Sequence, residues 1–186
     1  MKNNMLAVFF PGIGYHNDKP LLYYSRKIVK ELGYEEVCVE YHDMPGKVRG
    51  DAQKMREAVE IAYAQTEEFL SKIDFDKYER IVFVGKSIGT VVAARYANEH
   101  NIAAKLVLYT PVEATFSFVN GDSIAFIGDA DPWSELDEVK RLASEKKVSL
   151  SIFHACNHSL ECDNVEENIN ILSTVMKRTE EYLSKD

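Results

Sequence analysis

A serine between two glycines stands where a run of apolar residues changes into a run of small ones. The segment reads IVFVGKSIGTVVAARYA, and in it Gly85 and Gly89 frame Ser87. The apolar run predicts a buried strand, and the small residues predict a helix packed closely on a sheet. A Gly-x-Ser-x-Gly turn between strand and helix exposes the serine hydroxyl on strained backbone, where it can act as a nucleophile. A tight turn that merely contains serine is the alternative interpretation.

A serine nucleophile needs a general base, which in turn needs an acid to orient it. Three histidines follow Ser87 in the chain, namely His100, His154 and His158. His158 is favoured because it lies in the loop after the last predicted strand and before the last predicted helix. That loop is on the side of the sheet where the strands end and where Ser87 lies. His100 ends the helix that follows the serine, and His154 closes the last strand, where a structural role fits.

Two aspartates follow the fifth predicted strand, in the segment GDADPW. Asp131 is favoured as the orienting acid because it projects further into the loop, and Pro132 fits a chain that bends away there. Asp129 lies nearer the strand end and also fits a turn residue that bonds the loop backbone. The predicted catalytic set is therefore Ser87, Asp131 and His158.

Backbone N–H groups must stabilise the negative charge that develops during attack on a carbonyl. Ile88, directly after the nucleophile, is expected to supply one donor. Ile13, between Gly12 and Gly14 in the loop after the first strand, is expected to supply the other. A simple turn or a phosphate cradle also fits this loop, but Asn17 stands where a dinucleotide fingerprint has its third glycine.

Cys156, His158 and Cys162 form the one grouping that suggests a metal ligand set. Zinc sites usually combine paired ligands from two places in the chain, and no second pair is present. With Cys38, the chain has three cysteines, which we interpret as reduced thiols. We therefore expect neither a metal nor a cofactor.

Positioning these residues requires a fold that gathers the ends of several strands. Apolar runs alternate with amphipathic stretches, which predicts an α/β fold: a doubly wound, mostly parallel six-stranded sheet flanked by helices, in a single domain of residues 1–186. Ligands of such sheets bind at the carboxyl ends of the strands. The predicted strands are Leu6–Phe10, Glu36–Tyr41, Arg80–Gly85, Ala104–Tyr109, Ser123–Gly128 and Val148–Phe153.

The last amphipathic stretch predicts a helix that begins after Asp163, its expected N-cap. Apolar residues recur along it at helical spacing, and this stripe is expected to face the core. The stripe consists of Val165, Ile169, Leu172, Met176, Thr179 and Leu183.

Composition limits the partners. The 186 residues carry a formal net charge of −8, which argues against nucleic acid and anionic membranes. No apolar run approaches membrane-spanning length and no secretory segment is recognised, so a cytoplasmic protein with a small-molecule substrate is expected. Composition leaves the oligomeric state open.

Four segments in chain order, FFPGIGY, GKSIG, GDADPW and NHSLE, resemble the small lidless members of the α/β-hydrolase superfamily, in particular its dienelactone-hydrolase-like and carboxylesterase-like branches. The resemblance spans Leu6 to Leu183. It implies a minimal form of the fold that begins at the family's third strand and has no lid. Pro11 departs from the pattern, since many relatives have histidine there, and Lys86 fills a position often held by histidine or tyrosine.

The resemblance gives Ser87, Asp131 and His158 the triad roles and makes Ile13 and Ile88 the oxyanion donors. It implies a serine hydrolase that cleaves a small acyl ester or thioester through an acyl-enzyme. A peptidase or carbon–carbon bond hydrolase with the same triad, or a non-catalytic interaction protein of the same fold, remains an alternative.

Residues on loops at the strand ends are expected to line the acyl pocket, although each also fits ordinary loop packing. The connection of residues 111–122, where larger relatives insert a lid, is short and implies an open site. The expected pocket residues are Tyr15, Thr110, Phe116, Phe118 and Trp133.

Overall fold

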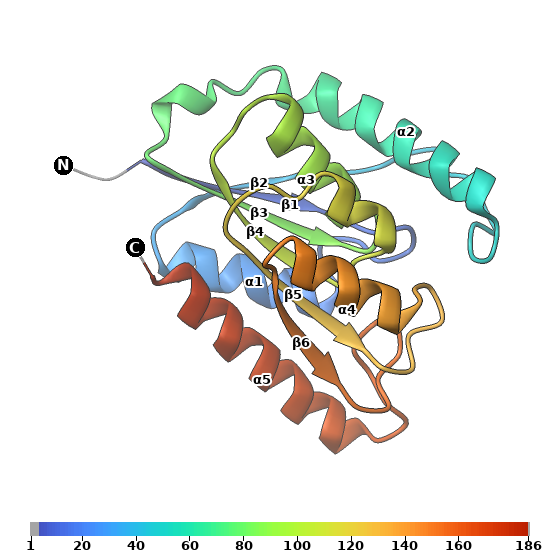
Figure 1. Cartoon of the computed structure of the whole chain (residues 1–186). Coiled ribbons are helices and arrows are strands. Elements are labelled where there is room, and N and C mark those ends of the chain that lie inside the picture. Colours follow the sequence, from blue (N-terminus) through green and yellow to red (C-terminus); the bar gives the residue numbers. More distant parts are fainter. Residues whose placement is uncertain (1–3, 186) are drawn as a thin grey trace.

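The apolar runs of the sequence form six strands that lie side by side in one parallel sheet (Figure 1). The computed structural model describes residues 4–185, so residues 1–3 and 186 of the expected domain lie outside the described part. Each strand lies within a few residues of its predicted position. The strands are β1 (Met5–Phe10), β2 (Glu35–Cys38), β3 (Arg80–Lys86), β4 (Ala104–Tyr109), β5 (Ser123–Gly128) and β6 (Ser149–Phe153).

Helices cover both faces of the sheet, which makes three layers (Figure 1). One face carries α2 (Ala52–Leu70), α3 (Ile88–Glu99) and α4 (Leu136–Glu145), and the other carries α1 (Pro20–Glu31) and α5 (Val165–Leu183). Central strands are therefore buried on both sides, which explains why β5 is apolar almost without interruption.

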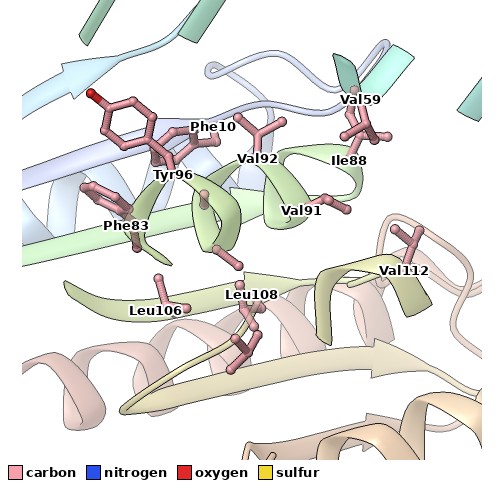
Figure 2. Packing of buried hydrophobic residues seen from close by; sticks show 14 of the residues in the cluster. Phe10, Val59, Phe83, Ile88, Val91, Val92, Tyr96, Leu106, Leu108 and Val112 are labelled. Carbon is pink, nitrogen blue, oxygen red and sulfur yellow. The ribbon is translucent and has the colours of Figure 1, made fainter. Parts of the chain in front are cut away.

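The larger of two core clusters lies between α3 and the sheet. Figure 2 shows Phe83 of β3 and Leu108 of β4 beneath α3 residues that include Val91, Val92 and Tyr96. The ring centroids of Phe83 and Tyr96 are 6.2 Å apart. This packing fixes α3 on the sheet, and with it the turn at the start of α3.

The strand order reverses its direction between β1 and β3. From one edge the order is β2-β1-β3-β4-β5-β6, so the chain moves outward from β1 to β2 and then returns to β3. Loops that leave neighbouring strands on either side of such a reversal diverge and open a binding crevice. The residues before Ser87 and the loop that begins at Pro11 meet at this point, because Phe10 of β1 pairs with Gly85 of β3.

The last helix differs from its prediction in two respects. Its N-cap is Asn164, whose side chain accepts a hydrogen bond from the Glu167 N–H, rather than Asp163. Val165 and Ile169 are 75% and 63% exposed, so the expected core stripe is wrong for the first turns. Periodicity predicts which residues share a face, but not how far along the helix a neighbouring layer extends. Along residues 4–185, no helix is both long and apolar enough to cross a membrane.

Gly89, two residues after Ser87, provides a test of how closely α3 packs against β1. A Cβ at Gly89 would lie 2.1 Å from the backbone oxygen of Phe10, so Gly89→Ala must displace α3 or β1. We expect the free energy of unfolding, measured with urea, to fall by about 3 kcal/mol. Gly46→Ala is the matched control, because a Cβ there meets no atom within 4 Å, and its effect should stay within about 1 kcal/mol. Equal stability of the two variants would contradict the close packing of α3.

Candidate active site

Ser87 occupies the sharp turn between β3 and α3. Its φ of 57° and ψ of −124° put a non-glycine residue in the left-handed region, a strained conformation that the surroundings must hold. The Ser87 N–H donates to the Tyr109 carbonyl at 3.0 Å, and the Ser87 carbonyl accepts from the Thr90 N–H at 2.9 Å. The strain is therefore held by neighbouring backbone on both sides.

His158 connects the serine to an aspartate. His158 Nε2 lies 2.8 Å from Ser87 Oγ, and Nδ1 lies 2.7 Å and 2.9 Å from the two carboxylate oxygens of Asp131. A carboxylate only accepts hydrogen bonds, so Nδ1 carries the proton and Nε2 is left to accept from the serine hydroxyl. The structure thus brings the three predicted catalytic residues into one hydrogen-bonded chain, from the ends of β3, β5 and β6.

Trp133 contacts Asp131 and His158 and holds both in place. Its backbone N–H donates to Asp131 Oδ1 at 2.9 Å. Its indole stacks on the imidazole of His158, with ring centroids 4.9 Å apart and planes 14° from parallel. The sequence suggested Trp133 as a pocket residue but gave no sign of this contact with the base.

Asp129 and His154 form a second pair on the protein surface. Asp129 Oδ2 lies 2.8 Å from His154 Nδ1, and Asp129 Oδ1 accepts from the Ala155 N–H. The His154 side chain is 94% exposed. This pair therefore ties the loops after β5 and β6 together, away from Ser87.

The loop after β1 approaches the nucleophile closely. Gly12 and Tyr15 exchange two backbone hydrogen bonds of 3.1 Å and 3.2 Å, which leaves Ile13 and Gly14 at the tip of a tight turn. A Cβ at Gly12 would lie 3.1 Å from the Ser87 Cβ, so only glycine lets the loop come this near without adjustment. Ile88 opens α3, and its N–H therefore has no acceptor within the helix.

Four of the five expected pocket residues are buried or partly buried. Phe116 is completely buried in the core, and so is Thr110, whose φ is 45°. Tyr15 is 7% exposed and its hydroxyl accepts a backbone hydrogen bond from α1. Phe118 lies beside an arginine two turns along α3. Trp133 contacts two residues of the triad, Asp131 and His158.

A cavity of about 450 Å³ adjoins the loop after β1. One wall is this loop, and the other is the segment that follows β2. Its volume is within the range of small-molecule sites. The residues of the second wall are Glu40, Tyr41, His42 and Met44.

The pKa values of the two histidines are shifted in opposite directions. Burial lowers the pKa of His158 below 6.5, although the hydrogen bond to Asp131 acts in the opposite direction. The hydrogen bond to Asp129 raises the pKa of the exposed His154. Near neutral pH, His158 is therefore the uncharged imidazole that a general base requires.

The alternative metal set does not assemble around His158. Both ring nitrogens of His158 already have partners, and burial raises the pKa of the Cys156 thiol to about 11. Nowhere in residues 4–185 do three histidine, cysteine or acidic side chains group as metal ligands would.

Comparison with known proteins gives the family and the fold. A family model described as an alpha/beta hydrolase domain matches residues 3–183. No curated protein sequence matches the chain. Est1E from Butyrivibrio proteoclasticus superposes with a TM-score of 0.67 at 13% identity, over 100% of this chain and 90% of that chain.

Two further solved structures have the same fold. The Pyrococcus furiosus esterase Pf2001 gives a TM-score of 0.66 at 14% identity, over 98% of this chain and 82% of that chain. XC6422 from Xanthomonas campestris, described as an a/b serine hydrolase without lid, gives 0.63 at 15% identity, over 100% and 85%. All three likenesses, at these identities, establish the fold alone.

The two Asp–His pairs should be separable by NMR titration of the imidazoles. We expect His158 to titrate below pH 6.5 and His154 above it. Asp131→Asn removes a negative charge beside His158 and should lower its pKa further, whereas Asp129→Asn should return His154 toward 6.5. Identical titration of the two histidines in the native protein would contradict the burial of His158.

Proposed function

The chain belongs to the alpha/beta hydrolase domain family, and from that premise we propose that it is a serine hydrolase that cleaves a small acyl ester or thioester. The observation that carries the proposal is the hydrogen-bonded chain Asp131–His158–Ser87. Each of its members has the partner that its role requires.

In the first half of the reaction, Ser87 Oγ attacks the carbonyl carbon of the substrate. His158 Nε2 takes the hydroxyl proton, and Asp131 stabilises the resulting imidazolium. The imidazolium then protonates the leaving alcohol or thiol as the carbon–oxygen or carbon–sulfur bond breaks. Ser87 is left as an acyl ester.

In the second half, water replaces the leaving group. His158 Nε2 takes a proton from the water, the resulting hydroxide attacks the acyl carbon, and the serine oxygen recovers the proton as it leaves. The N–H groups of Ile13 and Ile88 are the proposed donors to the carbonyl oxygen in both tetrahedral intermediates. The closeness of Gly12 to Ser87 supports the first donor, and the position of Ile88 at the start of α3 supports the second.

The connection between β4 and β5 supports an open site. It contains only the short 3-10 helix Glu113–Ser117, which packs on α3 and α4. Phe116 from this helix is buried in the core instead of covering a substrate. Little apolar protein surface would therefore be available to cover an acyl chain beyond its first carbons.

Substitution of the nucleophile tests the proposal directly. Ser87→Ala should lower hydrolysis of p-nitrophenyl acetate by several orders of magnitude while the far-UV circular dichroism stays unchanged. His158→Ala should be comparably severe, and Asp131→Asn should cost on the order of 10⁴ in rate, because it favours the wrong tautomer. The matched controls His154→Ala and Asp129→Asn alter the surface pair and should be mild. A Ser87→Ala variant with more than about a tenth of the native rate would overturn the assignment.

Acyl chain length provides a second test. Each buried CH₂ adds about 0.8 kcal/mol only where protein covers it. We therefore expect kcat/KM for p-nitrophenyl esters to peak at short chains, roughly two to six carbons, and then to fall. A steady rise to long-chain esters would show that an enclosed acyl site exists and would contradict an open one.

A further inference from the structure

The residue directly before the nucleophile is a buried lysine. Lys86 is 1% exposed, although lysine is rarely fully buried unless its charge is paired. Its ammonium lies over the ring of Tyr15, 4.8 Å from the ring centroid, which is a cation–π contact. The triad mechanism does not use Lys86, so its burial needs another explanation.

Tyr15 connects Lys86 to the loop that carries Ile13. The backbone of Tyr15 closes the tight turn through its two hydrogen bonds with Gly12. Its hydroxyl accepts from the Leu21 N–H at 3.1 Å, which anchors the ring on α1. An attractive contact between the Lys86 ammonium and this ring therefore helps to hold the base of the turn that presents Ile13.

Lys86 also acts on the triad through its charge. Asp131, from the loop after β5, attracts the ammonium, and the ammonium in turn disfavours the charged form of His158. Glu161 and Tyr109 are titratable groups that act on Tyr15. The oxygens of Asp131 bond to His158 and Trp133.

We propose that Lys86 is a positioning residue that, through its contact with the Tyr15 ring, holds the loop after β1 that presents Ile13. The inference rests on the proposed function, because it gives Lys86 a part in the same site. It extends that function by adding a cation that no step of the triad mechanism requires.

The proposal has a defined pH dependence. Burial lowers the pKa of Lys86 to about 7, and attraction to Asp131 opposes this fall. Below pH 7 the ammonium is charged, which moves the titration of His158 to lower pH. Above pH 7 it loses its proton and the contact with Tyr15 weakens. We therefore expect kcat/KM to rise with His158 deprotonation below pH 6.5 and to decline above about pH 7.

The test compares Lys86→Met with Lys140→Met. Lys140 is an exposed lysine of α4 paired with Asp137, so both variants remove one positive charge but only the first removes it from the site. Lys86→Met should lower kcat/KM roughly tenfold, mostly through kcat. It should also move the acid limb to higher pH and abolish the decline above pH 7. Lys140→Met should match the native profile.

Two Tyr15 variants separate the effect of the ring on kcat from the effect of its hydroxyl. Tyr15→Leu removes the cation–π contact and should lower kcat as Lys86→Met does. Tyr15→Phe keeps the ring and should be milder. If circular dichroism shows that Lys86→Met is unfolded, this pair decides the positioning role. Equal kcat for both Tyr15 variants would overturn it.

A measurement that does not depend on catalysis distinguishes a failure of this inference from a failure of the proposed function. In a Ser87→Ala background, NMR titration should show that His158 titrates at higher pH with Lys86→Met than with Lys140→Met. If the native protein hydrolyses no ester, the proposed function fails, while the titration still tests the charge coupling. Identical His158 titration and identical pH profiles in the two lysine variants would overturn the inference.

Discussion

One imidazole must accept a hydrogen bond from Ser87 on one side and donate another to Asp131 on the other, and its ring fixes the distance between the two. The sheet places the ends of β3 and β6 three strand spacings apart, which is about 14 Å. Loops must close that distance. Asp131 lies three residues beyond the end of β5 and His158 five beyond the end of β6, and these extensions let both side chains reach back to Ser87.

The two loops reach this position because they are joined to each other. The Ala130 N–H donates to the Cys156 carbonyl at 3.1 Å, and a Cβ at Gly128 would lie only 1.9 Å from the same oxygen. On the surface, Asp129 accepts from the Ala155 N–H and pairs with His154. The Asp129–His154 pair is an exposed contact between these loops, apart from the hydrogen-bonded chain of Ser87, His158 and Asp131.

The strands could be predicted, and so could the meeting of Ser87, Asp131 and His158 in one hydrogen-bonded chain, because local pattern and chain position constrain them. Ser87 needs a strand before it and a helix after it, and both are visible as periodicity. The burial of Phe116 and the exposure of Val165 could not be predicted, because each depends on where a distant layer of the fold ends. Lys86 is the clearest case, since a lysine at the end of a strand is ordinarily solvated and only the packed structure sets it over the Tyr15 ring.

The central claim is that the surroundings of Ser87 make this one serine an activated nucleophile. Mass spectrometry after treatment of the native protein with a fluorophosphonate tests it most directly, because the reagent bonds rapidly only to an activated serine. The account predicts one adduct per chain, located by peptide mapping on Ser87, and none after prior unfolding in urea. No adduct on the native protein, or an adduct on another residue while Ser87 stays free, would contradict it.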